Sequence, residues 1–208
     1  MAAELDYDRG MSKTQSSMVE LGSEARAFEL VDVVSGRAVG RDDVAATGGN
    51  EDATEGRGLL VMFICVHCPY VKHVEQELAR IGADYAGRIA IAAISANDVA
   101  AYPEDSPAEM KAQAERLGFR FPYLYDETQE VARAYDAACT PDFFLYDRAM
   151  RLVYRGQLDD SRPRRGEFGN DIPVTGKDLR AAMDAVLAGK QPDAEQRMSI
   201  GCNIKWRE

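Results

Sequence analysis

Four residues that can take part in redox or metal chemistry fall close together in this sequence. Cys65, His67, Cys68 and His73 lie within nine residues, in a chain that has four cysteines and two histidines in all. Cysteine and histidine side chains can exchange disulfides, hold a metal ion, or act as a nucleophile with its base. We therefore expect the chemistry of this chain to centre on residues 65–73.

The Cys65-Val66-His67-Cys68 segment has the spacing of a redox-active cysteine pair. It follows an apolar run over 59–64 and precedes a helical pattern, which predicts a position between a buried strand and a helix N-terminus. Backbone N–H groups and the helix dipole stabilise a thiolate there, and the thiolate is the species that attacks disulfides. We predict that Cys65, nearer the surface, is the nucleophile and that Cys68 is the resolving cysteine. A protonated His67 between them would stabilise the Cys65 thiolate further.

Two other interpretations of this segment stay open at the level of the sequence. The pair can be a buried structural one, or it can belong to a zinc site. The spacing from Cys65 to His73 begins like a zinc knuckle, but the expected fourth ligand position holds Leu78. A distant cysteine, Cys139 or Cys202, would have to complete the four ligands that structural zinc needs. We favour the redox pair, and we expect no metal and no cofactor.

Thr140-Pro141 is the second feature that bears on this chemistry. A proline before a strand often ends a helix and sets a turn. Alternatively, a cis proline would place the backbone of Thr140 beside the CxxC segment, ready to pair with a substrate strand. Local sequence does not separate these alternatives.

The elements that must position these residues alternate along the chain. We predict a hairpin over 28–39 and strands over 59–64, 89–94, 121–125, 143–146 and 152–154. We predict helices over 69–85, 107–118, 127–135 and 176–188, the last three capped by Ser106, Asp126 and Thr175. Alternation of strands and helices indicates an α/β domain with a central mixed sheet. We predict an arm over 1–23, a domain over 24–190 with a surface loop over 47–58, and an irregular but docked tail over 191–208.

Composition narrows the classes of partner. The chain has 208 residues and a formal net charge of −10, and an acidic surface repels nucleic acid. The longest apolar stretch, over 59–66, is too short to cross a bilayer, and no secretory signal is evident. We expect a cytoplasmic protein with no membrane and no nucleic-acid partner. Four cysteines are too few for a disulfide scaffold, and in a reducing compartment paired cysteines are more often catalytic or metal-binding.

Several longer segments carry a resemblance to a known family. They are MFICVHCPYVKHV, AISANDVAAYPEDSP, FPYLYDETQEVARAY, ACTPDFFLYD, YRGQLDDSRP and SIGCNIKW. Over about residues 24–206 the chain resembles the thioredoxin superfamily, and specifically its peroxiredoxin-like (AhpC/TSA, redoxin) and TlpA-like branch. The resemblance implies a thioredoxin fold with an N-terminal β-hairpin extension and a cis Pro141 opposite the CxxC segment. By position it matches Cys65 to the nucleophile, Cys68 to the resolving cysteine and Thr140-Pro141 to the substrate-binding turn.

The resemblance also guides the choice of reaction. Peroxiredoxins carry a proline and a threonine before the peroxidatic cysteine, and here those positions hold Val61 and Cys65. We therefore predict a thiol–disulfide oxidoreductase that acts on a protein or small-molecule disulfide, with a thioredoxin-type or glutathione electron donor. The alternatives are a peroxiredoxin-like thiol peroxidase with an antioxidant role in which Cys68 is oxidised, and a non-enzymatic redox-sensing or partner-binding protein.

The remaining cysteines are candidates for auxiliary thiols. Cys139 lies two residues before Pro141, so in such a fold it would lie near the CxxC pair, either as an extra resolving thiol or as a small buried residue. Cys202 lies four residues before Trp206, the single tryptophan, which suggests that the tail docks. We hypothesise that Cys202 takes part in a redox relay.

Overall fold

A computed structural model of the chain describes residues 13–48, 58–164 and 169–207. The predicted loop over 47–58 and the predicted arm over 1–23 lie partly outside these residues. A seven-stranded mixed sheet forms the centre, with the strand order β3-β2-β6-β5-β4-β8-β9. These strands are β2 (Glu29–Asp32), β3 (Ala38–Gly40), β4 (Leu59–Phe63), β5 (Ala90–Ser95), β6 (Tyr123–Tyr125), β8 (Asp142–Tyr146) and β9 (Leu152–Gly156). The α/β class, the mixed sheet and the N-terminal hairpin, β2 with β3, are therefore confirmed.

The central strand β4 is buried on both faces. Leu60 and Met62 contribute to one hydrophobic cluster, and Leu59, Val61 and Phe63 contribute to the other. Successive side chains of a strand point to opposite faces, so a continuous apolar run can serve both clusters. Parallel pairing with β5 and antiparallel pairing with β8 hold this strand in the middle of the sheet. The end of β4 is thereby a rigid platform for the segment that follows it.

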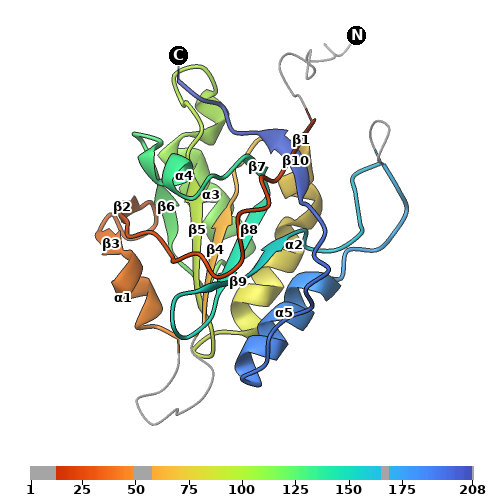
Figure 1. Cartoon of the computed structure of the whole chain (residues 1–208). Coiled ribbons are helices and arrows are strands. Elements are labelled where there is room, and N and C mark those ends of the chain that lie inside the picture. Colours follow the sequence, from red (N-terminus) through yellow and green to blue (C-terminus); the bar gives the residue numbers. More distant parts are fainter. Residues whose placement is uncertain (1–12, 49–57, 165–168, 208) are drawn as a thin grey trace.

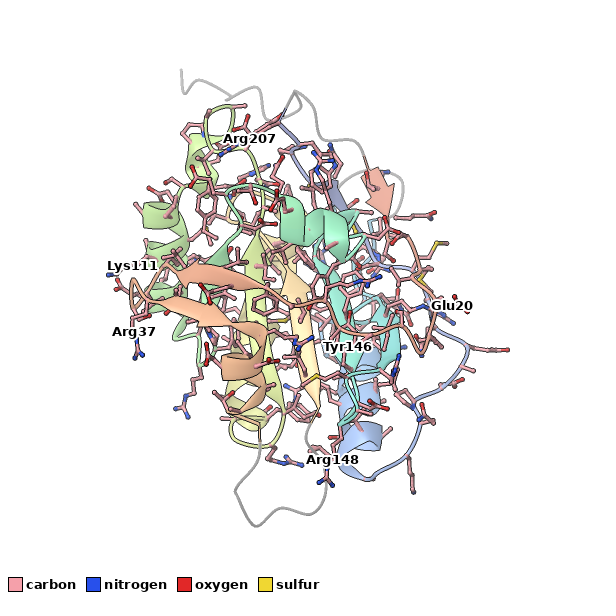
Figure 2. All side chains as sticks on the ribbon, turned by 60° about the vertical axis from the view of Figure 1, so that its left-hand side comes forward. Glu20, Arg37, Lys111, Tyr146, Arg148 and Arg207 are labelled. Atoms are coloured by element: carbon pink, nitrogen blue, oxygen red, sulfur yellow. The ribbon has the colours of Figure 1, made fainter. Side chains whose placement is uncertain are left out.

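Helices cover both faces of the sheet (Figure 1). Helices α2 (Pro69–Asp84), α3 (Pro107–Leu117) and α5 (Lys177–Leu187) pack on one face, and α1 (Arg41–Ala45) and α4 (Glu130–Ala134) on the other. A single turn, η1 (Pro103–Asp105), precedes α3. Figure 2 shows the exposed side chains of Arg37 and Lys111 at the outline of the molecule, whereas Tyr146 lies in the interior.

The helices α3, α4 and α5 begin in different ways. Ser106 accepts a hydrogen bond from the Glu109 N–H at 3.5 Å and caps α3, as predicted. The predicted Thr175 cap is wrong, because Gly176 is the N-cap of α5. Asp126 is not the N-cap residue of α4, which is Gln129, but its Oδ2 accepts the N–H of Ala132 in the first turn of that helix at 2.8 Å. Both Gln129 and Gly176 have a left-handed backbone, a conformation that the sequence patterns do not encode.

A second, three-stranded sheet joins the two ends of the chain, with the order β1-β10-β7. Its strands are β1 (Lys13–Gln15), β10 (Ile200–Asn203) and β7 (Cys139–Thr140). In Figure 1, β1 and β10 lie beside β7 at one end of the central sheet. The sequence did not predict these strands, and the tail over 191–208 is not irregular throughout. Strands of two to four residues carry too little periodicity to stand out from a loop.

Among the residues that the structure describes, no helix is both long and apolar enough to cross a membrane.

Candidate active site

The candidate site lies where the parallel strands β4, β5 and β6 end. Cys65 follows β4, separated from it by Ile64 alone, and Cys68 is the N-cap residue of α2. Asn97 follows β5 by two residues. The carboxyl ends of parallel strands meet at one edge of a sheet, which is where α/β proteins commonly place their functional groups.

Both cysteines of the CxxC segment are fully buried. Cys65 and Cys68 each expose 0% of their surface. The expectation that Cys65 lies nearer the surface is therefore wrong. Burial raises the pKa of the Cys65 thiol well above its usual value, helped by its hydrogen bond to Cys68 and by the negative charge of Asp105. Because the pKa of the buried Cys65 thiol is raised, its deprotonation needs a base nearby.

Cys68 is in a different electrostatic environment. Its Sγ lies 2.8 Å from the Sγ of Cys202 and 3.2 Å from the carbonyl oxygen of Thr140. Burial alone would raise its pKa, but hydrogen bonds from Cys202, Cys65 and the Val71 N–H hold the pKa of Cys68 well below its usual value. Val71 lies in the first turn of α2, so its amide belongs to the positive end of the helix dipole. The pKa shifts favour the thiolate at Cys68 over Cys65, although the Thr140 carbonyl, which accepts the Cys68 S–H of the neutral thiol, opposes it.

Thr140 lies directly against the two sulfurs. The Thr140–Pro141 peptide bond is cis, as the family resemblance implied. Besides its carbonyl contact with Cys68, Thr140 places its Oγ1 3.3 Å from the Sγ of Cys65. Of the two alternatives for this dipeptide, the structure has the turn that brings the Thr140 backbone to the CxxC segment.

His67 is held by a buried carboxylate. Its Nδ1 lies 2.5 Å from Asp105 Oδ2, and its ring stacks on Tyr102 at 5.5 Å between centroids. Burial would raise the pKa of Asp105, but the hydrogen bond from His67 keeps that pKa below its usual value. An ionised Asp105 fixes the proton of a neutral His67 on Nδ1. The buried Nε2 has no hydrogen-bond partner among the described residues and is then the basic nitrogen.

Asp105 also connects the CxxC segment to the chain's tail. Its Oδ1 accepts the backbone N–H groups of Val66 and His67 at 2.8 and 3.0 Å, and its Oδ2 accepts the amide of Asn97 at 2.7 Å. Asn97 Oδ1 in turn accepts the backbone N–H of Lys205 at 2.8 Å. These polar groups are nearly all buried, so the loop and the tail share one hydrogen-bond network.

A metal ion is less well suited to this site than the hydrogen-bond network is. Cys65, His67 and Asp105 can each offer a ligand atom within 4.8 Å of one another. However, Asp105 already accepts four hydrogen bonds, which is the capacity of a carboxylate. His73, the ligand that the zinc interpretation required, is not in this group and lines a small pocket beside Pro141 instead.

The auxiliary cysteines are placed differently from each other. Cys202, in β10, lies against Cys68. Cys139 is also buried, but its Sγ lies 3.6 Å from the carbonyl oxygen of Pro141, and burial raises its pKa well above the usual value. Neighbouring residues of a strand point to opposite sides, which directs Cys139 and Thr140 apart. Of these two candidates, only Cys202 reaches a sulfur of the CxxC segment.

Sequence reasoning missed three buried polar residues. Asp105 and Asn97 are separated from the CxxC segment by about thirty residues or more and offer no motif. Asp142, in β8, exposes 0% of its surface. Its position directly after Thr140-Pro141 was a signal, since an acid at the start of an apolar strand is unusual. Thioredoxins carry a buried acid on the strand before the CxxC segment; here the acid is on β8, opposite Phe63.

Asp142→Asn is expected to change how stability depends on pH. Burial raises the pKa of Asp142 to about 7, against 3.8 ordinarily. The folded state therefore binds this proton more tightly than the unfolded state does. The contribution of the bound proton to the free energy of unfolding is fully present below about pH 4 and is lost as the pH rises through 7. The variant should be more stable than the parent by on the order of 2–4 kcal/mol at pH 8, with less difference at pH 5. Urea unfolding at both pH values measures this, and equal differences would contradict it.

Comparisons with known proteins give a family match and two similar structures. The model of the AhpC/TSA family matches residues 21–155. A crystal structure of an uncharacterized conserved protein from Geobacillus kaustophilus is 51% identical, with a TM-score of 0.85, over 95% of this chain and 98% of that one. A hypothetical protein from Sinorhizobium meliloti 1021 is 47% identical, with a TM-score of 0.84, over 93% and 98%. No curated protein gave a significant sequence match.

A more distant structure identifies the fold. A thiol:disulfide interchange protein of the thioredoxin family from Chlorobium tepidum TLS is 15% identical, with a TM-score of 0.57, over 80% of this chain and 97% of that one. An identity this low bears on the fold alone. The predicted thioredoxin fold, with its mixed sheet, flanking helices and hairpin extension, is confirmed.

Proposed function

Because the chain belongs to the AhpC/TSA family and has a thioredoxin fold, we propose that it is a thiol–disulfide oxidoreductase that uses the Cys65–Cys68 pair. One observation carries this proposal. Both sulfurs lie within 3.3 Å of Thr140, the residue before the cis proline. A disulfide substrate whose backbone pairs with Thr140 would bring its own sulfur to the same place.

We assign the first attack to Cys68, in contrast to the assignment from sequence alone. The N-cap position and the donors around Cys68 favour its thiolate, whereas Cys65 is protonated by the same reasoning. The Cys68 thiolate attacks one sulfur of the substrate disulfide, forms a mixed disulfide and releases the first substrate thiolate. Cys65 then attacks Cys68, which releases the second thiolate and closes the Cys65–Cys68 disulfide.

His67 is the proposed proton acceptor for the second step. The Cys65 thiol must lose its proton before it can attack, and a His67 ring nitrogen lies within 4.8 Å of its sulfur. With Nδ1 bonded to Asp105, the basic Nε2 of His67 can take this proton and later pass it to a leaving thiolate. Thr140 and Pro141 serve as the substrate-binding turn.

The overall reaction transfers two electrons from the dithiol to the substrate. The substrate is a protein or small-molecule disulfide that leaves as two thiols, while the protein becomes oxidised at Cys65 and Cys68. A thioredoxin-type protein or glutathione then reduces this disulfide and completes the cycle. We propose that the reaction takes place in the cytoplasm, where such donors are kept reduced.

The proposal is tested by turnover of a fluorescently labelled peptide disulfide, with dithiothreitol as the electron donor. We expect the protein to accelerate peptide reduction above the rate with dithiothreitol alone, and the Cys65→Ser/Cys68→Ser variant to give only that background rate. Cys139→Ser is the matched control, because Cys139 is equally buried but bonds away from the pair. Equal rates for the parent and the double variant would overturn the proposal.

A thiol peroxidase is the second candidate, and one observation favours it. A thiolate at a helix N-terminus with another thiol 2.8 Å away can be oxidised by peroxide to a sulfenic acid and then condense to a disulfide. Stopped-flow measurement of hydrogen peroxide consumption separates the two functions. A rate no faster than that of free cysteine excludes the peroxidase, and peroxide turnover faster than peptide reduction would make it the main activity.

A further inference from the structure

The tail strand β10 occupies the edge where a substrate strand is expected. It pairs antiparallel with β7, and Cys202 lies directly opposite Thr140 in the register. A substrate strand that pairs with Thr140 would put its own reactive cysteine near this position. The chain thus supplies, from within itself, both the strand and the thiol of a bound substrate.

The Cys202 sulfur lies close enough to the Cys68 sulfur to react with it. The two Sγ atoms are 2.8 Å apart, so formation of a disulfide bond of about 2.05 Å requires a sulfur movement of under about 1 Å. The two residues are separated by 134 positions in the sequence, so the tail's docking alone creates this contact. Cys202 is 3% exposed, which shields the pair from competing thiols.

Several specific contacts hold the tail in its docked position. The Ile204 N–H donates to the Ala138 carbonyl at 3.3 Å, and the Lys205 carbonyl accepts from the Gln129 side chain at 2.8 Å. Farther along, Trp206 lies under the guanidinium of Arg133 at 4.3 Å. Through the Lys205 N–H and Asn97, the tail also reaches Asp105 and hence the backbone of the CxxC segment.

Gly201 makes this close approach feasible. A Cβ at this position would lie 2.1 Å from the Thr140 carbonyl oxygen and 2.6 Å from its carbon. No side chain fits there while β10 stays paired with β7. The glycine therefore lets the backbone of the tail approach Thr140 closely enough for Cys202 to contact Cys68.

We propose that Cys202 is a second resolving thiol for Cys68, and this inference rests on the proposed function. Strand β10, which occupies the position expected for a substrate strand, brings Cys202 to Cys68. Cys202 attacks Cys68 in its mixed disulfide and passes its proton to the leaving substrate sulfur, so that the bond from Cys68 to the substrate breaks, the substrate leaves as a thiol and the Cys68–Cys202 bond forms. It can equally attack the Cys65–Cys68 disulfide, which forms Cys68–Cys202 and returns Cys65 as a thiolate that takes up the proton Cys202 lost. This exchange is redox-neutral, and the electrons that the substrate receives come from the dithiol. A substrate strand displaces β10 when it pairs with Thr140, and β10 must return to Thr140 before Cys202 can attack Cys68.

Glutathione disulfide tests this proposal on variants that lack Cys65. With one equivalent of it, Cys65→Ser is expected to release two glutathione molecules and to acquire a Cys68–Cys202 disulfide. Cys65→Ser/Cys202→Ser is expected to keep one glutathione on Cys68, and Cys65→Ser/Cys139→Ser should behave like Cys65→Ser. Intact-protein and peptide mass spectrometry distinguish these products.

Gly201→Ala in the Cys65→Ser background tests whether β10 delivers the thiol. Cys202 is then still present but its strand cannot keep its register with Thr140. Loss of glutathione should slow by on the order of 10²-fold or more, because a positioned attack becomes an unpositioned one. Circular dichroism checks that the variant is folded.

The outcomes separate this inference from the proposed function. If Cys65→Ser keeps its glutathione as long as Cys65→Ser/Cys202→Ser does, the role of Cys202 is refuted and the oxidoreductase stands. Equal rates of glutathione loss from Cys65→Ser and Cys65→Ser/Gly201→Ala would refute delivery by β10. If the parent and all variants fail to react with glutathione disulfide or with the peptide disulfide, the proposed function fails and this inference fails with it.

Discussion

Cys68→Ser should abolish disulfide reduction, with a loss on the order of 10³-fold or more in the rate of peptide reduction. The reason is that Cys68 has the favoured thiolate and is a partner in both oxidised states of the protein. A serine hydroxyl is not ionised at neutral pH and does not form a disulfide. The remaining thiols do not replace it, because burial raises the pKa of Cys65, and the hydrogen bond to Cys68 together with burial raises the pKa of Cys202 in the parent protein.

Cys65→Ser is the informative comparison for this result. This variant should still make the first attack, because the helix N-terminus at Cys68 is unchanged and a serine hydroxyl can replace the Cys65 thiol as a hydrogen-bond donor to Cys68. The initial burst of thiol released from the peptide disulfide, measured in a single turnover, should therefore be retained in Cys65→Ser and absent in Cys68→Ser. A Cys68→Ser protein that formed a stable mixed disulfide on Cys65 would contradict the assignment and restore Cys65 as the nucleophile.

Asp105→Asn is expected to reduce the rate of the second step on the order of 10²–10⁴-fold. An asparagine would keep the shape and the acceptor for the Val66 and His67 N–H groups, but its amide group would face the His67 ring as a donor. His67 would then have to accept at Nδ1 and carry its proton on Nε2, which removes the base that Cys65 needs. Quenched-flow measurement of the mixed disulfide should show it accumulating.

Stability provides a second test at the same residue. Asp105→Ala would leave the donors of Val66, His67 and Asn97 unpaired in the interior, so we expect a loss of about 3–5 kcal/mol in the free energy of unfolding. The neighbouring Glu104 is exposed, and Glu104→Gln is the matched control with no effect expected on either measurement. If Asp105→Asn resolves its mixed disulfide as fast as the parent, His67 is not the proton acceptor.

Much of the fold was predictable because strong local patterns determine it. The apolar run of β4, the three- and four-residue spacing of α2 and the Ser106 cap of α3 each report a feature that a few neighbouring residues decide. The strands β1, β7 and β10 were missed because they exist only through their partners. Two short strands that are individually unremarkable become a sheet once a docked tail lies between them.

The sequence predicted most of the residues that form the site, but not the role of each residue. The sequence indicated Cys65, Cys68 and His67 from their spacing and Thr140-Pro141 from a proline before a strand. The cis proline at Pro141 followed from the family resemblance. The pKa of each cysteine depends on its burial and on hydrogen-bond donors from distant segments, such as Cys202. No local sequence pattern encodes this burial or these donors. Asp105 is similar, because a carboxylate in a loop gains its role only when the fold turns it toward His67.

The measurement that tests the central claim most directly is a single turnover of the reduced, unmodified protein with one equivalent of the peptide disulfide. Peptide mass spectrometry then locates the disulfides in the protein and counts the peptide thiols released. We predict two peptide thiols per protein and one intramolecular disulfide that includes Cys68, with Cys65 or Cys202 as its partner. A peptide that remains oxidised while all four protein cysteines remain thiols, or a disulfide that leaves Cys68 as a thiol, would contradict the proposed chemistry.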